Sequence, residues 1–92
     1  MESIVIAYRS DNYRTVEKDT LEALKDGFTV TVDLDVLPSL EIEDMRRLIS
    51  LLRRSRQTGG EFALRASRRD LRRVLAVTAL DRVFTVLSAD AA

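Results

Sequence analysis

The sequence predicts an α/β fold in which three strands alternate with three helices in the order βαβαβα. Three short apolar segments of strand length, near residues 3–8, 28–36 and 61–66, are separated by longer segments with helical periodicity. Connections of this length allow crossovers between parallel strands. The second and third strand segments alternate apolar and polar residues, so the helices are expected mainly on one face of a mostly parallel sheet.

The chain begins with a β–α unit. The segment SIVIAY (residues 3–8) has the length and composition of a strand, and the polar stretch RSDN follows it. From Asp11 onward the apolar residues recur at helical spacing, and Gly27 is placed to end that helix. The expected buried stripe of the helix is Val16, Thr20, Leu21, Ala23 and Leu24.

The second strand is predicted from strict alternation in FTVTVDLDV (residues 28–36). The expected dry face carries Phe28, Val30, Val32, Leu34 and Val36, and the wet face carries Thr29, Thr31, Asp33 and Asp35. Pro38 breaks this strand, and Ser39 is expected to cap the helix that follows. That helix has an apolar stripe of Met45, Leu48, Ile49, Leu51 and Leu52, and Gly59–Gly60 ends it.

A third strand and helix complete the predicted order. The segment EFALRA (residues 61–66) alternates again and is expected to bury Phe62, Leu64 and Ala66. Ser67, with Asp70 three residues later, resembles a capping box at the start of a helix. The residues expected to be buried in this last helix are Leu71, Val74, Leu75 and Thr78.

Composition limits the classes of function. The 92 residues are 46% hydrophobic and 33% charged, which predicts one globular domain over residues 1–92. The chain contains no cysteine and no histidine, so we expect no metal site, no cofactor and no enzymatic activity. There is no glycine-rich phosphate loop. No apolar run has the length of a transmembrane helix, and the N-terminus MESIVIAYRS is acidic where a signal peptide is basic, so we expect a cytoplasmic protein without direct membrane insertion.

Charge is divided unequally along the chain. Residues 1–44 hold eleven acidic and four basic residues, whereas residues 45–92 hold four acidic and eleven basic ones. One interpretation is that the two halves attract each other within a compact domain. The other is an electropositive face that meets an acidic protein. Nucleic acid is not expected as a partner, because no aromatic residue is interleaved with the arginines.

The segment from residue 51 to residue 84 resembles the C-terminal half of STAS domains, the module of bacterial anti-sigma factor antagonists and of sulfate-transporter tails. In that family the last stretch typically reads Arg-Arg-Val-Leu, two variable residues, Thr-Gly-Leu-Asp and an apolar residue with Phe. Here the matching residues are Arg72-Arg73-Val74-Leu75, Thr78-Ala79-Leu80-Asp81, Val83 and Phe84. The resemblance covers residues 28–86, and Ala79 departs from it by replacing the family's glycine.

The resemblance also implies a meaning for the stretch LPSLEIEDMRR (residues 37–47). Antagonists of this family usually carry an acid, a phosphorylatable serine, a second hydroxyl residue, a glycine and a leucine at the start of the second helix. A gap-free count places that motif on residues 41–45, with Ile42 at the phosphoacceptor position. Isoleucine has no hydroxyl, so the usual phosphorylation switch cannot operate there.

Three interpretations of the acids Glu41, Glu43 and Asp44 remain open. They can compensate the helix dipole, or their fixed charges can imitate the phosphorylated state. They can also flank an exposed Ile42 in a contact surface for a partner protein, although an Ile42 turned inward as a hydrophobic staple has the same sequence. The predicted partner-binding residues are Ser39, Glu41, Ile42, Glu43, Asp44, Met45, Arg46 and Arg47.

Two kinds of function follow from the resemblance. The first is a non-enzymatic module that binds an anti-sigma factor or another regulatory protein and is not switched at the usual serine. The alternative is a structural subunit that docks on the ATPase of a membrane transporter. The chain also lacks the N-terminal strand usual in the family, which leaves a sheet edge bare and predicts a homodimer or a higher species.

Overall fold

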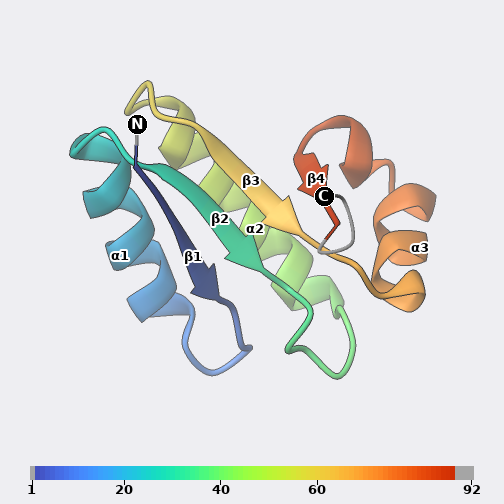
Figure 1. Ribbon diagram of the computed structural model, residues 1–92. Helices are drawn as coiled ribbons and strands as arrows, with labels where there is room; N and C mark the ends of the chain where they lie inside the picture. Colours follow the sequence, from blue (N-terminus) through green and yellow to red (C-terminus); the bar gives the residue numbers. More distant parts are fainter. Residues whose placement is uncertain (1, 89–92) are drawn as a thin grey trace.

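The computed structural model describes residues 2–88 and contains the three predicted β–α units, followed by two short elements (Figure 1). The first unit is strand β1 and helix α1, the second is β2 and α2, and the third is β3 and α3. A 3₁₀ helix, η1, and a strand, β4, follow. Their bounds are β1 Ser3–Ala7, α1 Tyr13–Lys25, β2 Thr29–Asp33, α2 Ile42–Arg56, β3 Phe62–Arg65, α3 Arg69–Val77, η1 Leu80–Arg82 and β4 Thr85–Leu87.

The four strands form one parallel sheet in the order β1-β2-β3-β4, which confirms the predicted sheet type. Val30 in β2 lies opposite Ile4 on one side and Phe62 on the other, and Leu64 in β3 lies opposite Val86. The predicted order ended at the third helix, so it missed β4. A strand of three residues is too short to show an alternating pattern in sequence.

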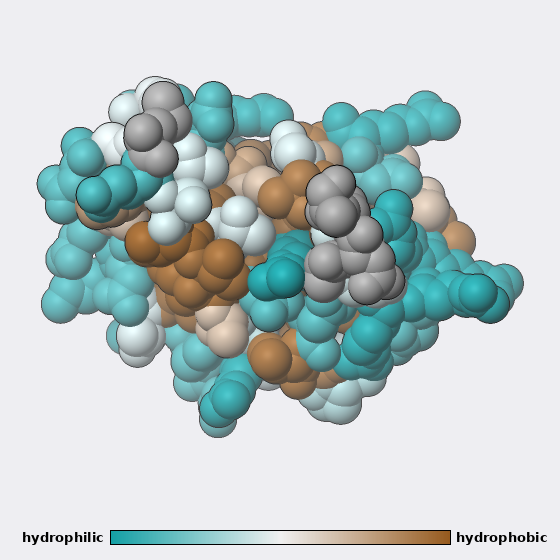
Figure 2. Space-filling model, in the orientation of Figure 1, coloured by the Kyte–Doolittle hydropathy of each residue, from teal (hydrophilic) through white to brown (hydrophobic). Residues whose placement is uncertain are grey.

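Helices α1 and α2 pack behind the sheet as it is drawn in Figure 1, and the face toward the viewer carries no helix over β1 and β2. The alternation predicted for β2 is confirmed, because Val30 and Val32 are fully buried whereas Thr29 and Thr31 are half-buried. Figure 2 shows a hydrophobic area on this uncovered face where β1 lies. The alternation predicted for the third strand is not seen in β3, because Ala63 is buried next to Leu64 and Phe62 is only half-buried. Over β1 and β2 the sheet has one face in the core and one face toward solvent.

One continuous core lies between the sheet and the helices. Its largest fully buried side chains are Tyr8, Leu34, Leu37, Leu48, Leu51, Leu64, Leu71, Leu75, Val16, Val30, Val32 and Thr20. Phe62 and Phe84 contact each other with ring centroids 6.2 Å apart, which closes the core on the β4 side. The fully buried side chains of the core include residues from α1, α2 and α3, so each of these three helices packs against the core through an apolar stripe.

Two predictions of buried residues are wrong. Val36 was expected to continue the buried face of the second strand, but the strand ends at Asp33 and Val36 is exposed. Thr78 was expected to be buried, but it is exposed at the C-terminus of α3, where its hydroxyl donates a hydrogen bond to the Val74 carbonyl (2.7 Å). In both cases the regular element ends before the pattern in the sequence does.

The capping box predicted from Ser67 and Asp70 is also wrong. Helix α3 has Arg68 at its N-cap, and no side chain caps it there. The Asp35 carboxylate accepts hydrogen bonds from the backbone N–H groups of Ser67 (2.8 Å) and Arg68 (3.2 Å) instead. Asp70 is paired with the Arg68 guanidinium at 2.6 Å. The Asp35 carboxylate, in the loop after β2, therefore binds the backbone directly before α3.

Ala79 has a left-handed backbone conformation, with φ +61° and ψ +16°, between α3 and η1. This is the position where the resembling family has glycine, and an L-residue is strained there. We expect Ala79→Gly to raise the free energy of unfolding by about 0.5 kcal/mol, the relief of strain exceeding the extra entropy of the unfolded chain. Urea denaturation measures this change.

Ala76→Gly is the control for this substitution, because Ala76 is an exposed residue inside α3. Glycine in a helix interior is expected to lower the free energy of unfolding by about 0.5–1 kcal/mol. Opposite signs at the two positions support strain at Ala79. Destabilisation by both substitutions contradicts it.

Candidate functional site

Helix α2 begins at Ile42, and its N-cap is Glu41. The Asp44 carboxylate turns back to accept a hydrogen bond from the Glu41 backbone N–H at 3.0 Å. Ser39, which was predicted to be the cap, lies before the helix, and its hydroxyl donates to the Glu41 carboxylate at 2.6 Å. The predicted cap is therefore wrong by two residues.

Asp44 is buried, with 2% of its surface exposed, and is the centre of a polar network. One carboxylate oxygen accepts hydrogen bonds from the Tyr8 hydroxyl (2.7 Å) and from the Ser10 hydroxyl (2.9 Å), and the other accepts the Glu41 N–H. Tyr8 is itself fully buried just after β1. The network joins the end of β1 to the first turn of α2, which fixes the position of that turn.

Arg47 makes a second connection between the same two segments. Its guanidinium donates a hydrogen bond to the Ser10 carbonyl (2.8 Å) and lies 5.6 Å from the centroid of the Tyr13 ring. Glu43, one turn earlier in α2, lies 3.8 Å from the Arg47 guanidinium. The loop after β1 and the start of α2 therefore form one continuous surface.

The loop between β2 and α2 is held from the other side. Leu37 and Leu40 are buried in the core although they belong to no helix or strand. The Arg68 guanidinium donates hydrogen bonds to the carbonyl oxygens of Leu37 and Pro38. These contacts hold the residues that precede α2 against the core and against Arg68.

Ile42 is 67% exposed, so the inward-turned staple is excluded. Its neighbours Glu41 and Glu43 are exposed as well. Of the other predicted partner-binding residues, Ser39 and Arg46 are exposed, Met45 and Arg47 are half-buried, and Asp44 is buried. An apolar side chain between two carboxylates at the surface can contact a partner, whereas Asp44 can act only through the position of α2.

Tyr8 and Ser10 were not among the residues predicted for the site. Tyr8 was assigned to the first strand segment and Ser10 to the polar stretch after it, more than thirty residues before Asp44. The available signal is positional, because residues at the carboxyl ends of parallel strands lie at the same end of the sheet. That rule predicts proximity but not which side chains form hydrogen bonds.

The buried Tyr8 hydroxyl predicts a pH dependence. Burial, followed by the hydrogen bond to Asp44, raises the pKa of Tyr8 to about 12, above the ordinary value near 10. The folded state thus holds this proton more tightly than the unfolded chain. The resulting stabilisation is complete below about pH 10 and is lost as the pH rises toward about 12.

Tyr8→Phe is expected to remove this part of the pH dependence, because phenylalanine does not titrate. Denaturation in urea at several alkaline pH values measures it. Tyr13→Phe is the comparison: burial and the hydrogen bond to Glu17 raise the pKa of Tyr13 as well, so this variant removes a separate part of the alkaline dependence. An identical alkaline decline in the Tyr8→Phe variant contradicts the assignment.

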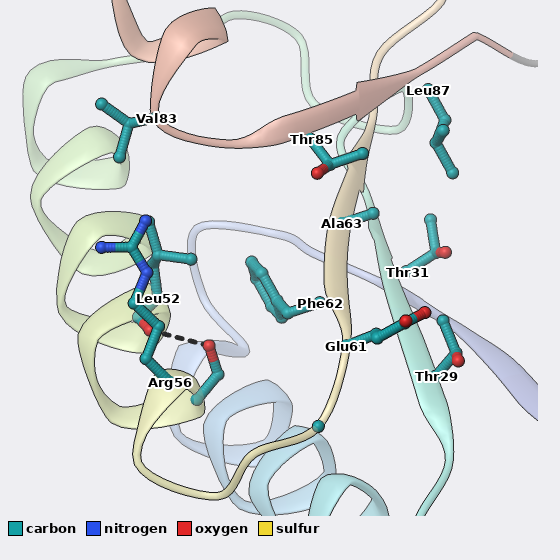
Figure 3. A pocket seen from close by; sticks show the side chains of 12 residues that line it. Thr29, Thr31, Leu52, Arg56, Glu61, Phe62, Ala63, Val83, Thr85 and Leu87 are labelled. Atoms are coloured by element: carbon teal, nitrogen blue, oxygen red, sulfur yellow. Dashed lines mark hydrogen bonds between the residues drawn. The ribbon is translucent and has the colours of Figure 1, made fainter.

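A hollow of the described surface lies away from this site, between the C-terminal half of α2 and strands β3 and β4 (Figure 3). It has a volume of about 570 Å³. Figure 3 shows Phe62 pointing toward Leu52 and Arg56 of α2.

No sequence model of a protein family matches the chain, and no curated protein sequence matches it. Solved structures do resemble it. A Thermotoga maritima protein assigned as an anti-sigma factor antagonist has a TM-score of 0.70 at 20% identity, over 96% of this chain and 80% of that one. An anti-sigma factor antagonist (STAS) domain protein from Planctomyces limnophilus has a TM-score of 0.70 at 21% identity, over 94% and 82%. An anti-sigma factor antagonist from Mycobacterium paratuberculosis has 0.63 at 19%, over 92% and 73%.

The comparison agrees with the resemblance found in the C-terminal half of the sequence and extends it to nearly the whole chain. Within residues 2–88, none of the helices combines the length and the apolar composition needed to cross a lipid bilayer. The TM-scores show that the fold is shared, and at an identity near 20% the likeness shows the fold alone: the chain has a STAS-like fold.

Proposed function

We propose that this chain is a non-enzymatic protein-interaction module of the anti-sigma factor antagonist type that acts in the cytoplasm. Its partner is an anti-sigma factor or a related regulatory protein. The contact surface is the start of α2, with Ile42 as the apolar contact and Glu41 and Glu43 as flanking charges. The observation that carries the proposal is the 67% exposure of Ile42 on a turn that the buried Asp44 network holds in place.

We also propose that serine phosphorylation at the usual place does not regulate this binding. Ile42 offers no hydroxyl, and Glu43 next to it repels an incoming triphosphate. Ser39 is the nearest hydroxyl before the helix, and it is occupied as a donor to the Glu41 carboxylate. Binding is then set by the amount of partner rather than by a kinase.

Ile42→Asp is expected to weaken binding of the cognate anti-sigma factor by about thirtyfold, because it removes the burial of one apolar side chain and adds a charge. Titration calorimetry measures the affinity. Val77→Asp is the matched control, since Val77 is 79% exposed on α3. Equal effects of the two substitutions, or none at Ile42, contradict the proposed surface. Purification of the chain with a membrane transporter ATPase instead supports the structural-subunit alternative.

Incubation with an anti-sigma factor that has kinase activity, together with ATP, is expected to leave the protein unphosphorylated. Intact-mass spectrometry measures this. Ile42→Ser, which restores a hydroxyl at the usual position, tests whether the kinase recognises the surface at all. Stoichiometric phosphate on Ser39 of the unmodified sequence contradicts the proposal, because the switch is then displaced by three residues rather than absent.

A further inference from the structure

The unequal division of charge along the chain is only partly a division in space. Residues 1–44 carry seven more acidic than basic residues, and residues 45–92 carry seven more basic than acidic ones. The strands lie in the sheet in their sequence order, so β1 and β4 form opposite edges. Of the eleven acids in residues 1–44, five lie beyond residue 28, in β2, in the loop after it and at the start of α2, so the β1–α1 end holds six acidic and four basic residues.

The outer side of α1 carries Asp19 and Glu22, and Asp26 follows directly after the helix; these three residues are the acidic stripe. All three are exposed, and their spacing of three and four residues puts them on one side of the helix. The side of α1 that faces α2 is marked by Glu17, which pairs with Arg54 of α2 at 2.7 Å. By helical spacing, the acidic stripe lies on the side of α1 away from Glu17, and therefore away from α2.

The free edge of β1 is uncharged and open. The Glu2 backbone carbonyl accepts a hydrogen bond from the Thr29 N–H, and the Tyr8 backbone N–H donates one to the Asp33 carbonyl. The backbone groups of the even-numbered residues in this segment therefore point toward β2. The backbone groups of the odd-numbered residues face outward, and Val5 at the centre of the strand is 57% exposed. An edge without charge, proline or bulge is one that another chain can approach.

The β4 edge carries a basic stripe of Arg69, Arg72 and Arg73 on α3. These exposed arginines line a hollow of about 560 Å³ between α3 and β4. Leu75 and Val86 supply apolar lining, and Asp81 is the acidic residue of that lining. The hollow can therefore receive carboxylates together with a small apolar surface.

We propose that copies of this chain associate head to tail, with the acidic stripe and β1 edge of one copy docked against the basic stripe and hollow of the next. Charge complementarity favours this arrangement, because the two ends of one molecule match each other. A symmetric contact between two β1 edges instead brings the two acidic stripes together. The formal net charge of zero leaves no overall repulsion between copies.

Two neutralised variants test the direction of the contact. Arg69→Gln/Arg72→Gln/Arg73→Gln removes the basic stripe and keeps the acidic one, and Asp19→Asn/Glu22→Gln/Asp26→Asn does the reverse. Sedimentation equilibrium at low salt is expected to show unmodified protein growing beyond a dimer with concentration. Each variant alone is expected to associate about tenfold more weakly.

An equimolar mixture of the two variants is expected to form a 1:1 dimer that grows no further, because only one complementary pair of ends remains. Arg14→Gln/Lys18→Gln/Lys25→Gln, on the other exposed side of α1, is the matched control and is expected to associate like the unmodified protein. Salt is expected to weaken association, since exposed charges are screened.

Several results overturn the proposal. A mass near 10.4 kDa for the unmodified protein up to about 1 mM at low salt shows that the ends do not associate. Full association of either neutralised variant by itself shows a symmetric contact that does not need both stripes. Association that is unchanged by salt shows that charge does not drive it. None of these results bears on the binding of a partner at Ile42.

Discussion

Asp44→Ala is expected to lower the free energy of unfolding by about 3 kcal/mol. Asp44 accepts hydrogen bonds from Tyr8, Ser10 and the Glu41 N–H in a site that is closed to solvent. Alanine leaves the fully buried Tyr8 hydroxyl without its acceptor and removes the carboxylate that binds the helix N-terminus. Urea denaturation followed by circular dichroism measures the change.

Glu43→Ala is the matched control, because Glu43 is an exposed acid in the same turn whose contact is a 3.8 Å surface pair with Arg47. It is expected to change the free energy of unfolding by less than about 0.5 kcal/mol. A double-mutant cycle with Tyr8→Phe then isolates the Tyr8–Asp44 hydrogen bond. Equal effects of Asp44→Ala and Glu43→Ala contradict a stabilising role for the buried network and point to the helix dipole alone.

Leu37→Ala is expected to lower the free energy of unfolding by about 2–4 kcal/mol. Leu37 is 1% exposed and packs in the core from a loop, where its own carbonyl accepts a hydrogen bond from Arg68. Truncation opens a cavity beneath the segment that leads into α2. The same variant is therefore expected to weaken partner binding at Ile42, because the turn is no longer held in one position.

Val36→Ala is the control for Leu37→Ala. Val36 is the preceding residue in the chain and is 44% exposed, so its truncation is expected to change stability by less than about 0.5 kcal/mol. Denaturation midpoints of the two variants in the same buffer make the comparison. A larger effect at Val36 contradicts the burial of Leu37.

Tyr8 and Asp44 also bear on the open interpretations of the acids before α2. Glu41 and Asp44 form a capping box at the start of α2, which gives both a role at the helix N-terminus, and partner contact by Glu41 and Glu43 stays a proposal. Asp44 is buried and binds the Glu41 N–H, whereas Glu41 and Glu43 are exposed beside Ile42. Imitation of a phosphorylated state stays a prediction, which Glu43→Gln together with the binding titration addresses.

The sequence by itself determined the order and type of the main elements. Alternation in residues 28–36 and helical spacing in residues 42–56 report which face of each element is apolar, and burial of that face drives folding. The resemblance of residues 72–84 to STAS domains predicted the fold, and the solved structures share that fold. The exposed position of Ile42 was one of two alternatives that the sequence left open.

Tertiary structure decided what the local pattern does not contain. Ser39 is the preferred cap by residue type, but the helix begins after Glu41, whose N–H binds the buried Asp44 carboxylate. The contact between Tyr8 and Asp44 joins residues 36 positions apart, and no periodicity reports such a pair. β4 forms because it pairs with β3, and three residues acquire strand geometry from that partner rather than from their own propensity.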